Sequence, residues 1–182
     1  MQKRITLSAL LLASLLLNGC ANTPTEDIKI NAETNPKINV NAYQSYTWLG
    51  SESSLNDPEQ KWQPSSLDLA GDIKYLIDRE LRKRNIYSAT ENAEIGVAYF
   101  LGIDMAAMQL KQDPESATQV LKNIPKGALV ITLIDMNNGY IIWAGTAQAE
   151  VGQQFEASVA RERLDYTIRS MFQKLSPRGL LK

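Results

Sequence analysis

After about residue 27, hydrophobic and polar residues alternate along much of the chain, and this two-residue period predicts β-strands. Short strands are expected at 28–30, at 38–40 and over the aromatic stretch 43–49. The strongest alternation covers residues 95–103. The polar segment 50–64 is rich in Ser, Asp, Asn and Pro, and we expect it to be a loop.

Two segments instead repeat their hydrophobic residues with the 3.6-residue period of an amphipathic helix. The first helix is expected over 65–84, where Ser65 and Asp68 resemble a capping box and Asn85 suits a left-handed residue after the last turn. The second is expected over 156–174, where Ser-Pro follows.

The clearest signal for a β-hairpin lies in the second half of the chain. Hydrophobic runs at 128–134 and 140–143 flank Asn137-Asn138-Gly139, and Asn-Gly between apolar runs favours a tight hairpin turn. The segment 105–126 allows two interpretations. Asp113-Pro114-Glu115 could cap a short helix through Leu121, or the whole piece could form a flap.

These elements predict an α+β fold, a two-layer sandwich with two main helices on one face of the sheet. The sheet is expected to be antiparallel or mixed, with about four to six strands. Strands that flank the first helix could pair in parallel. The length of the chain fits one domain with short additional segments.

The first twenty residues have the layout of a secretory signal peptide. A basic start at Lys3 and Arg4 precedes an apolar run from Ile5 to Leu17, which is too short to span a bilayer well. The alternative is a buried N-terminal helix of a cytosolic protein. Polar sequence follows at once and no amphipathic period is visible, so we favour secretion.

The end of this segment, Leu17-Asn18-Gly19-Cys20, resembles the bacterial lipobox, with Leu17 and Gly19 as its recognition residues and Asn18 in place of the usual Ala or Ser. The resemblance implies cleavage before Cys20, diacylglycerol on its sulfur, and an acyl chain such as palmitate on the new amine. Two or three acyl chains anchor a protein stably, whereas one holds it weakly. The alternative is an unpaired reactive thiol. Ala21, rather than aspartate, favours the inner face of the outer membrane by the same resemblance.

The organisation we therefore expect is a signal peptide at 1–19, a lipidated cysteine with its tether at 20–27, and a single periplasm-facing α+β domain at 28–182.

Composition narrows the chemistry further. Among 182 residues there is no histidine and only one cysteine, which excludes a Ser-His-Asp triad, a Cys-His pair and an intramolecular disulfide. We expect no metal and no cofactor other than the covalent lipid. The formal net charge of −1 offers no broad basic field, so nucleic acid is not expected as a partner. Carboxylate chemistry and a Ser-Lys pair remain open.

Four stretches in order are similar to a bacterial lipoprotein family known as domain of unknown function 4136. They are the aromatic stretch 43–49, the helix end 80–85, the strand 93–99 and the hairpin 129–145. Asn85 stands where members more often carry Gly, and 105–126 has no counterpart. The resemblance implies a periplasm-facing, lipid-anchored α+β domain, and it implies no established activity and no catalytic residues.

A few residues invite a functional interpretation beside a structural one. Aromatic and small side chains could line a ligand or packing face, and these are Tyr46, Trp48, Gly96, Ala98, Gly102 and Trp143. Core packing is the commoner role for strand aromatics. Asp135 suits a turn better than catalysis.

The charged residues are expected to be structural or solvated. Asp78 and Glu80 belong to a series of spaced charges that normally marks a solvated helix face. Four acids in expected loops could meet a cation, although no EF-hand spacing is present: Asp57, Glu59, Asp113 and Glu115.

Three functions compete. The first is a non-enzymatic envelope protein that acts as an interaction or assembly module of the outer membrane, with the membrane and an envelope protein as partners. The second is a carrier or sensor of a small apolar or lipid ligand held between helices and sheet, suggested by the small residues at Gly96, Ala98 and Gly102. The third is a carboxylate-based hydrolase.

Overall fold

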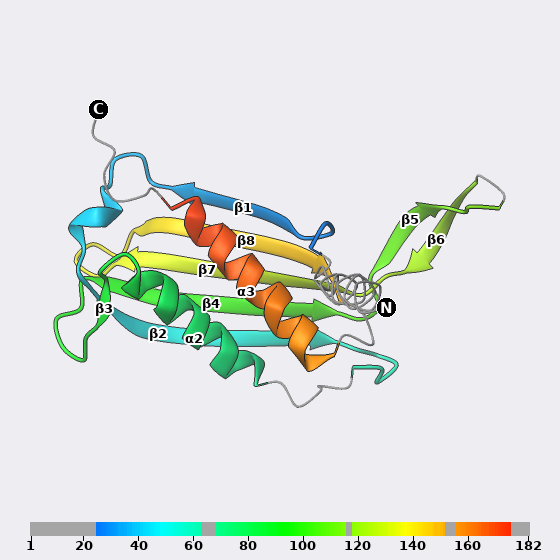
Figure 1. The fold of residues 1–182 in the computed structure, drawn as a ribbon, viewed down its shortest axis with the longest axis horizontal. Helices are drawn as coiled ribbons and strands as arrows, with labels where there is room; N and C mark the ends of the chain where they lie inside the picture. The colour runs from blue at the N-terminus through cyan, green and yellow to red at the C-terminus, as the bar shows by residue number, and fades with distance from the viewer. Residues whose placement is uncertain (1–24, 63–67, 116–117, 152–155, 176–182) are drawn as a thin grey trace, which may run out of the picture.

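Six strands form one sheet, and two helices lie side by side on one of its faces (Figure 1). The computed structural model describes residues 25–62, 68–115, 118–151 and 156–175. The strand order is β1-β8-β7-β4-β2-β3, and β5 and β6 form a separate pair. The strands are β1 (Lys29–Thr34), β2 (Ser45–Asn56), β3 (Tyr87–Ser88), β4 (Ile95–Asp104), β5 (Met108–Gln112), β6 (Gln119–Asn123), β7 (Lys126–Asp135) and β8 (Ile141–Glu150). The helices are α2 (Leu69–Arg82) and α3 (Ala157–Gln173).

The sheet is mixed because α2 connects two strands that run in the same direction. β2 precedes α2 in the sequence and β4 follows it, and these two strands pair in parallel. The remaining neighbours in the series β1, β8, β7 and β4 pair antiparallel. The α+β sandwich expected from the sequence is therefore confirmed, including its mixed sheet and the helices on one face.

Helix α2 begins at a polar cap, and a left-handed residue follows three residues after its end at Arg82. The Asp68 carboxylate accepts a hydrogen bond from the backbone N–H of Gly71 at 2.9 Å, so Asp68 is the N-cap itself and Ser65 lies outside the described residues. Asn85 has φ of 56°, as expected. The final helix agrees within one residue at each end with the prediction.

The hairpin of β7 and β8 turns where the sequence predicts it. Gly139 takes φ of +74°, and the Asp135 side chain accepts a hydrogen bond from the backbone N–H of Asn137 at 2.8 Å. The second strand continues well beyond Trp143, because β1 pairs with its other edge as far as Gln148.

Two local expectations are wrong. Residues Val40–Ala42 form a short 3-10 helix rather than a strand, because the Asn39 side chain accepts from the Asn41 backbone N–H and favours a turn. Residues Gly50–Asn56 are not loop but the second half of β2. Their partner is β4, which supplies a parallel ladder along its full length, and the polar side chains suit an exposed edge strand.

The segment 105–126 contains a β-hairpin arm, formed by β5 and β6, that projects from one end of the body (Figure 1). A short helix through Leu121 is therefore wrong. Asp113 accepts a hydrogen bond from the Glu115 backbone N–H within the turn instead of capping a helix. The flap interpretation is closer to what the structure shows.

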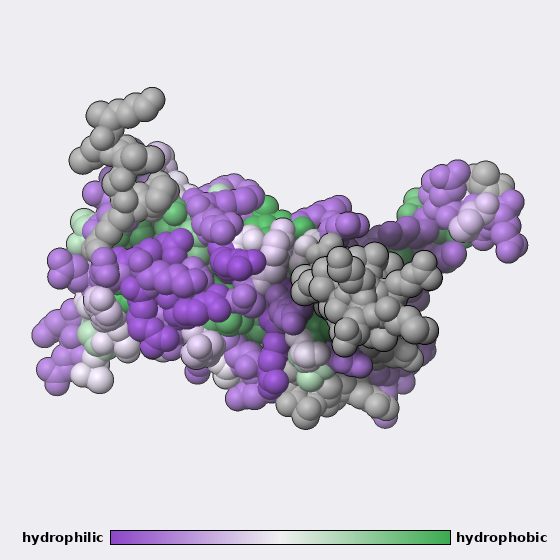
Figure 2. Space-filling model, in the orientation of Figure 1, coloured by the Kyte–Doolittle hydropathy of each residue, from purple (hydrophilic) through white to green (hydrophobic). Residues whose placement is uncertain are grey.

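The core fills the space between the helices and one face of the sheet. Alternate residues of the central strands point into it, as in Ile95, Val97 and Tyr99 of β4, while the residues between them face away. The helices contribute Ile73 and Ile77 from α2, and α3 adds its own apolar face. Their solvent side is mainly hydrophilic (Figure 2).

Candidate functional site

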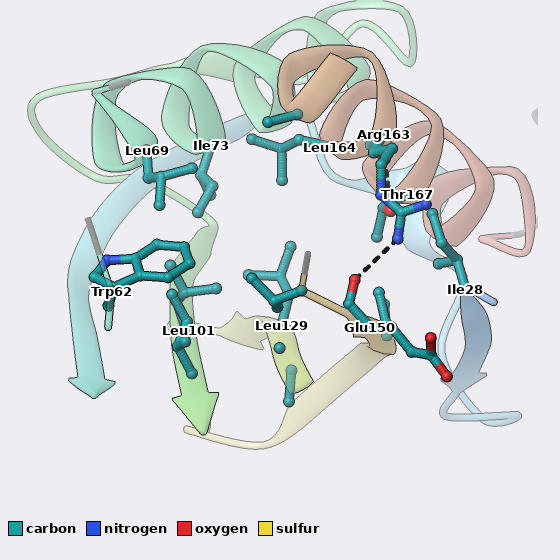
Figure 3. A pocket seen from close by; sticks show the side chains of 17 residues that line it. Ile28, Trp62, Leu69, Ile73, Leu101, Leu129, Glu150, Arg163, Leu164 and Thr167 are labelled. Atoms are coloured by element: carbon teal, nitrogen blue, oxygen red, sulfur yellow. Dashed lines mark hydrogen bonds between the residues drawn. The ribbon is translucent and has the colours of Figure 1, made fainter. Parts of the chain in front are cut away.

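An apolar cavity of about 170 Å³ lies between the helices and the sheet at the end that carries the arm. It forms where the first turns of α2 and α3 meet the ends of β4 and β8 and the start of β7 (Figure 3). An engineered cavity of about 150 Å³ with an apolar lining stays dry and binds benzene, so this space suits a small apolar group. Its apolar lining includes Ile28, Trp62, Leu69, Ile73, Leu101, Ile103, Leu129, Ala147, Ala149 and Leu164.

The two sides of the cavity differ in polarity. Trp62, Leu69 and Leu101 form one side, while the Arg163 guanidinium lies on the other, near Ile28 and Glu150 (Figure 3). A ligand here would meet hydrocarbon on most sides and polar atoms at one edge. This is the usual layout of a small-molecule site.

Arg163 is buried, and its charge is compensated. It donates two hydrogen bonds to the Asp27 carboxylate, at 2.8 and 2.7 Å, and a third to the Glu150 carbonyl at 3.2 Å. Asp27 also accepts from the Glu150 backbone N–H at 2.8 Å. Burial opposes ionisation of Asp27, but the bonds from Arg163 and Glu150 outweigh it and hold its pKa below the ordinary value. The pair therefore fastens the chain before β1 to the wall of the cavity.

A second charged group lies at the opposite end of the helices. Glu80 is only 3% exposed and contacts Arg79, Lys83 and Arg84, and Arg79 also pairs with Asp165 of α3. Burial opposes the ionisation of Glu80, yet hydrogen bonds from Lys83 and Arg79 hold its pKa below the ordinary value. The expectation of a solvated helix face is therefore wrong for Glu80.

The same expectation is wrong for Asp78. It accepts hydrogen bonds from the Tyr46 hydroxyl at 2.5 Å and from Trp48 Nε1 at 3.2 Å, which ties α2 to β2. Burial and the bond to Asp78 raise the pKa of Tyr46. Helical periodicity alone predicts that Asp78 and Glu80 lie on a charged, solvated face. In the structure the aromatic residues of β2 bind Asp78 and neighbouring cations bind Glu80, and these partners offset the cost of burying a carboxylate.

The six residues expected on a ligand or packing face lie in three places. Tyr46 and Trp48 lie under α2, and Trp48 meets Tyr99 edge to face with ring centroids 6.1 Å apart. Trp143 lies two strands beyond β4 and is fully buried, with its ring centroid 4.9 Å from that of Phe172. Among the described residues its indole N–H has no hydrogen-bond partner, so its role is packing. Trp48 and Trp143 therefore lie in separate parts of the core.

The small residues of β4 face away from the helices. Gly96, Ala98 and Gly102 alternate with the core residues, so they line the outer face of the sheet. Gly96 allows close approach of the side chains of Leu49 and Met136, which a Cβ there would displace. A cavity between helices and sheet does exist, but other β4 residues line it, namely Leu101 and Ile103.

Asp135 has the turn role expected for it. It accepts from the backbone of Asn137, from the Tyr43 hydroxyl at 2.9 Å and from the Asn138 side chain at 2.9 Å. These bonds, led by the one from Asn137, hold its pKa below the ordinary value. Burial and Asp135 together raise the pKa of Tyr43 to about 12.

The remaining sites are described only in part. Leu17, Gly19 and Cys20 lie outside the described residues, as does the rest of 1–24. Asp57 organises a turn by accepting from the backbone N–H groups of Lys61 and Trp62. Within the described ranges, no group of three acidic or cysteine side chains could hold a metal ion. In those ranges, too, no helix has the length and apolarity needed to cross a bilayer.

Sequence reasoning missed the buried ion pair beside the cavity and the aromatic side chain in its wall. Arg163 stands on the apolar stripe of α3, one residue before Leu164 and four before Thr167, and a charge in that position is the signal that could have revealed a buried ion pair. The sequence pattern places Asp27 in the tether and Trp62 in a loop. Nothing local links either of them to α3, because the contacts span up to 136 residues.

Comparison with solved structures supports the fold. A DUF4136 family protein from Bacteroides thetaiotaomicron matches with a TM-score of 0.50 and 7% identity, over 82% of this chain and 96% of that one. A PDZ domain protein from Parabacteroides distasonis matches with a TM-score of 0.52 and 12% identity, over 94% of this chain but only 40% of that one. The PelC dodecamer from Paraburkholderia phytofirmans matches over 80% of this chain and 97% of that one, with a TM-score of 0.41 and 16% identity.

Comparison by sequence is more specific. No curated protein matches the chain significantly. The family model of a domain of unknown function, DUF4136, matches residues 30–175, from the second residue of β1 to two residues beyond α3. This range includes the sheet, both helices and the arm. The chain therefore belongs to the DUF4136 family, whose function is unknown.

Proposed function

We propose that this chain is a lipid-anchored, non-enzymatic protein of the bacterial envelope that holds a small apolar group, such as part of an acyl chain, in the cavity beside Arg163. The observation that carries the proposal is the apolar space of about 170 Å³ between helices and sheet. The anchor is supported by the lipobox-like run that ends at Cys20 and by an N-terminal segment typical of secretion.

The chemistry of the wall favours an uncharged ligand. Arg163 and Asp27 compensate each other, so the cavity offers no net charge to a carboxylate or an amine. Burying an unpaired ion in such a place is costly. An alkyl or aryl group therefore fits better than a free ion, with a polar end at the edge near Glu150.

Ligand binding can be tested with benzene and 1-octanol as probes on the mature chain. Amide NMR signals around the cavity should shift on titration. Ala147→Leu narrows the cavity and should weaken binding by roughly tenfold or more. Ala144→Leu is the matched control, since Ala144 lies on the same strand but faces away from the helices. If neither probe shifts these signals, or if both variants weaken binding equally, the cavity is not a ligand site.

The anchor has its own test. Cells grown with a labelled fatty acid should label the wild-type protein, and Cys20→Ser should abolish the label. Labelling that persists in the serine variant would show that Cys20 is not the acylated residue.

A second function, docking of an envelope protein, is favoured by the outer face of the sheet. Leu49, Phe100 and Met136 there are 48, 40 and 43% exposed, next to the small residues of β4. Apolar exposure of this kind marks an interaction surface. In-cell crosslinking of the wild-type protein should capture one envelope protein reproducibly. The Phe100→Glu variant should no longer capture it. Capture that is unchanged by Phe100→Glu would exclude this face.

A further inference from the structure

The β5–β6 arm exposes an apolar face. Met108, Leu110 and Leu121 are 55, 64 and 65% exposed, and none belongs to the core of the body. Leu110 lies directly opposite Leu121 in the ladder, and Met108 lies two residues away on the same side. Figure 2 shows hydrophobic colour along the arm beside hydrophilic residues.

An arm built in this way requires a surface against which to pack. A two-stranded hairpin alone is marginally stable in water, and it gains stability when one face packs on something apolar. At the base of this arm Asn123 donates to the Met105 carbonyl at 3.0 Å, and farther along β5 the Lys111 side chain pairs with Glu150 of the body at 3.3 Å. These contacts fix where the arm leaves the body without covering its apolar face.

The position of the arm indicates which surface covers it. The arm and the start of β1 lie at the same end of the molecule (Figure 1), and the residues that line the cavity belong to that end as well. Cys20 precedes Thr25 by five residues, which span at most about 17 Å when fully extended. A lipid on Cys20 therefore keeps the bilayer surface within reach of this end.

The arm's other side carries charges that suit such a surface. Lys111 and Lys122 alternate with the apolar residues, so they project from the opposite side of the ladder. An arm with one charged and one apolar side can lie on lipid with the apolar side inserted and the charged side in water. Lys111 already pairs with Glu150 of the body. Three side chains are too few for a stable dimer, which buries about 800 Å² on each partner.

We propose that Met108, Leu110 and Leu121 dock the arm on the phospholipid surface that holds the Cys20 lipid, so that the end of the sandwich with the cavity lies next to the membrane. The inference rests on the proposed anchor and adds a second membrane contact to it. The lipid on Cys20 and the weak contact of the arm together fix the orientation of the protein on the membrane, which neither contact fixes alone.

The test uses the mature, lipidated chain in vesicles of phosphatidylethanolamine and phosphatidylglycerol with added nitroxide lipids. With Cys20 acylated, Leu121→Cys supplies the only thiol for an environment-sensitive fluorophore such as NBD. Lys122→Cys is the matched control, one residue away on the opposite side of the ladder. We expect a blue-shifted emission and at least twofold stronger nitroxide quenching at position 121 than at 122.

Vesicle flotation separates failure of the anchor from failure of the arm. A chain that floats while both probes remain equally unquenched would overturn the arm contact and leave the anchor intact. A blue shift at position 121 without nitroxide quenching would place the probe against protein rather than lipid. This result would also overturn the contact between the arm and the membrane. A chain that does not float would overturn the anchor, and the arm proposal with it. Leu110→Asp combined with Leu121→Asp should abolish the quenching seen with a probe at Met108→Cys.

Discussion

The two ends of the sandwich are packed in opposite ways. At the end of the β7–β8 turn, Trp143 fills the space under Phe172 and Glu80 is enclosed by cations. At the arm end, helices and sheet enclose a cavity, and an ion pair of Arg163 with Asp27 closes one side. Close packing at the end of the β7–β8 turn stabilises the protein. The arm end can therefore contain unfilled space for a ligand at a modest cost in the free energy of unfolding.

The largest contrast is expected between two tryptophans. Trp143→Ala should lower the free energy of unfolding by about 3–5 kcal/mol, because it leaves a cavity under Phe172. Trp62→Ala, its counterpart in the cavity wall, should cost about 1 kcal/mol, because Trp62 is only half-buried. Urea unfolding of both variants measures the difference. Equal losses would remove the distinction between the two ends.

A smaller effect is expected from the charge cluster around Glu80. Glu80→Gln leaves three cations without their buried partner and should destabilise the protein by roughly 2 kcal/mol, less than for a sealed pair because Lys83 is half-exposed. The exposed Glu52→Gln is the control and should have an effect below about 0.5 kcal/mol. Should Glu80→Gln match this control, Glu80 would not be a structural acid.

At the arm end the corresponding change should cost less still. Arg163→Met replaces the guanidinium by hydrocarbon and leaves Asp27 without its ion-pair partner. It should destabilise the protein by only about 1 kcal/mol, because Asp27 keeps access to solvent and to the Glu150 backbone N–H. Amide hydrogen exchange at β1 should accelerate while exchange at β4 is unchanged. Faster exchange throughout the sheet would mean that this pair supports the whole fold.

The mildest test is acidification. Glu80 and Asp27 both have pKa values in the folded state below their ordinary values, so they stabilise the fold above those values and lose this contribution as the pH falls through the folded pKa. Stability should therefore decline as the pH falls below about 4.5. The unfolding temperature of Glu80→Gln should fall less steeply with decreasing pH than that of the wild-type protein. Parallel curves would place the acid sensitivity elsewhere.

Local patterns predict most of the fold, since each element is encoded within its own residues. The Asn-Gly turn, the period of α2 and the alternation of β4 all correspond to observed elements. The second half of β2 escapes such reasoning because its polar residues form a strand only through pairing with β4. Val40 escapes it because one Asn39 side chain redirects the backbone.

The candidate site is less predictable because it joins segments that are distant in sequence. Leu101 and Ile103 carry an ordinary strand pattern, and nothing local shows that the space above them is unfilled. The expected role of the small residues fails for a simple reason. Alternation places Gly96 and Ala98 on the face away from the helices, so space for a ligand comes from the helix ends instead.

The pairing of β1 with β8 has a consequence for how the chain folds. The first strand of the sheet pairs with the last, and Asp27 accepts a hydrogen bond from a backbone N–H 123 residues further along. Contacts at such separation form late, because a long loop must close before they can stabilise anything. When the chain appears with its N-terminus first, β1 stays unpaired until β8 has followed. The segment nearest Cys20 is therefore among the last to join the sheet.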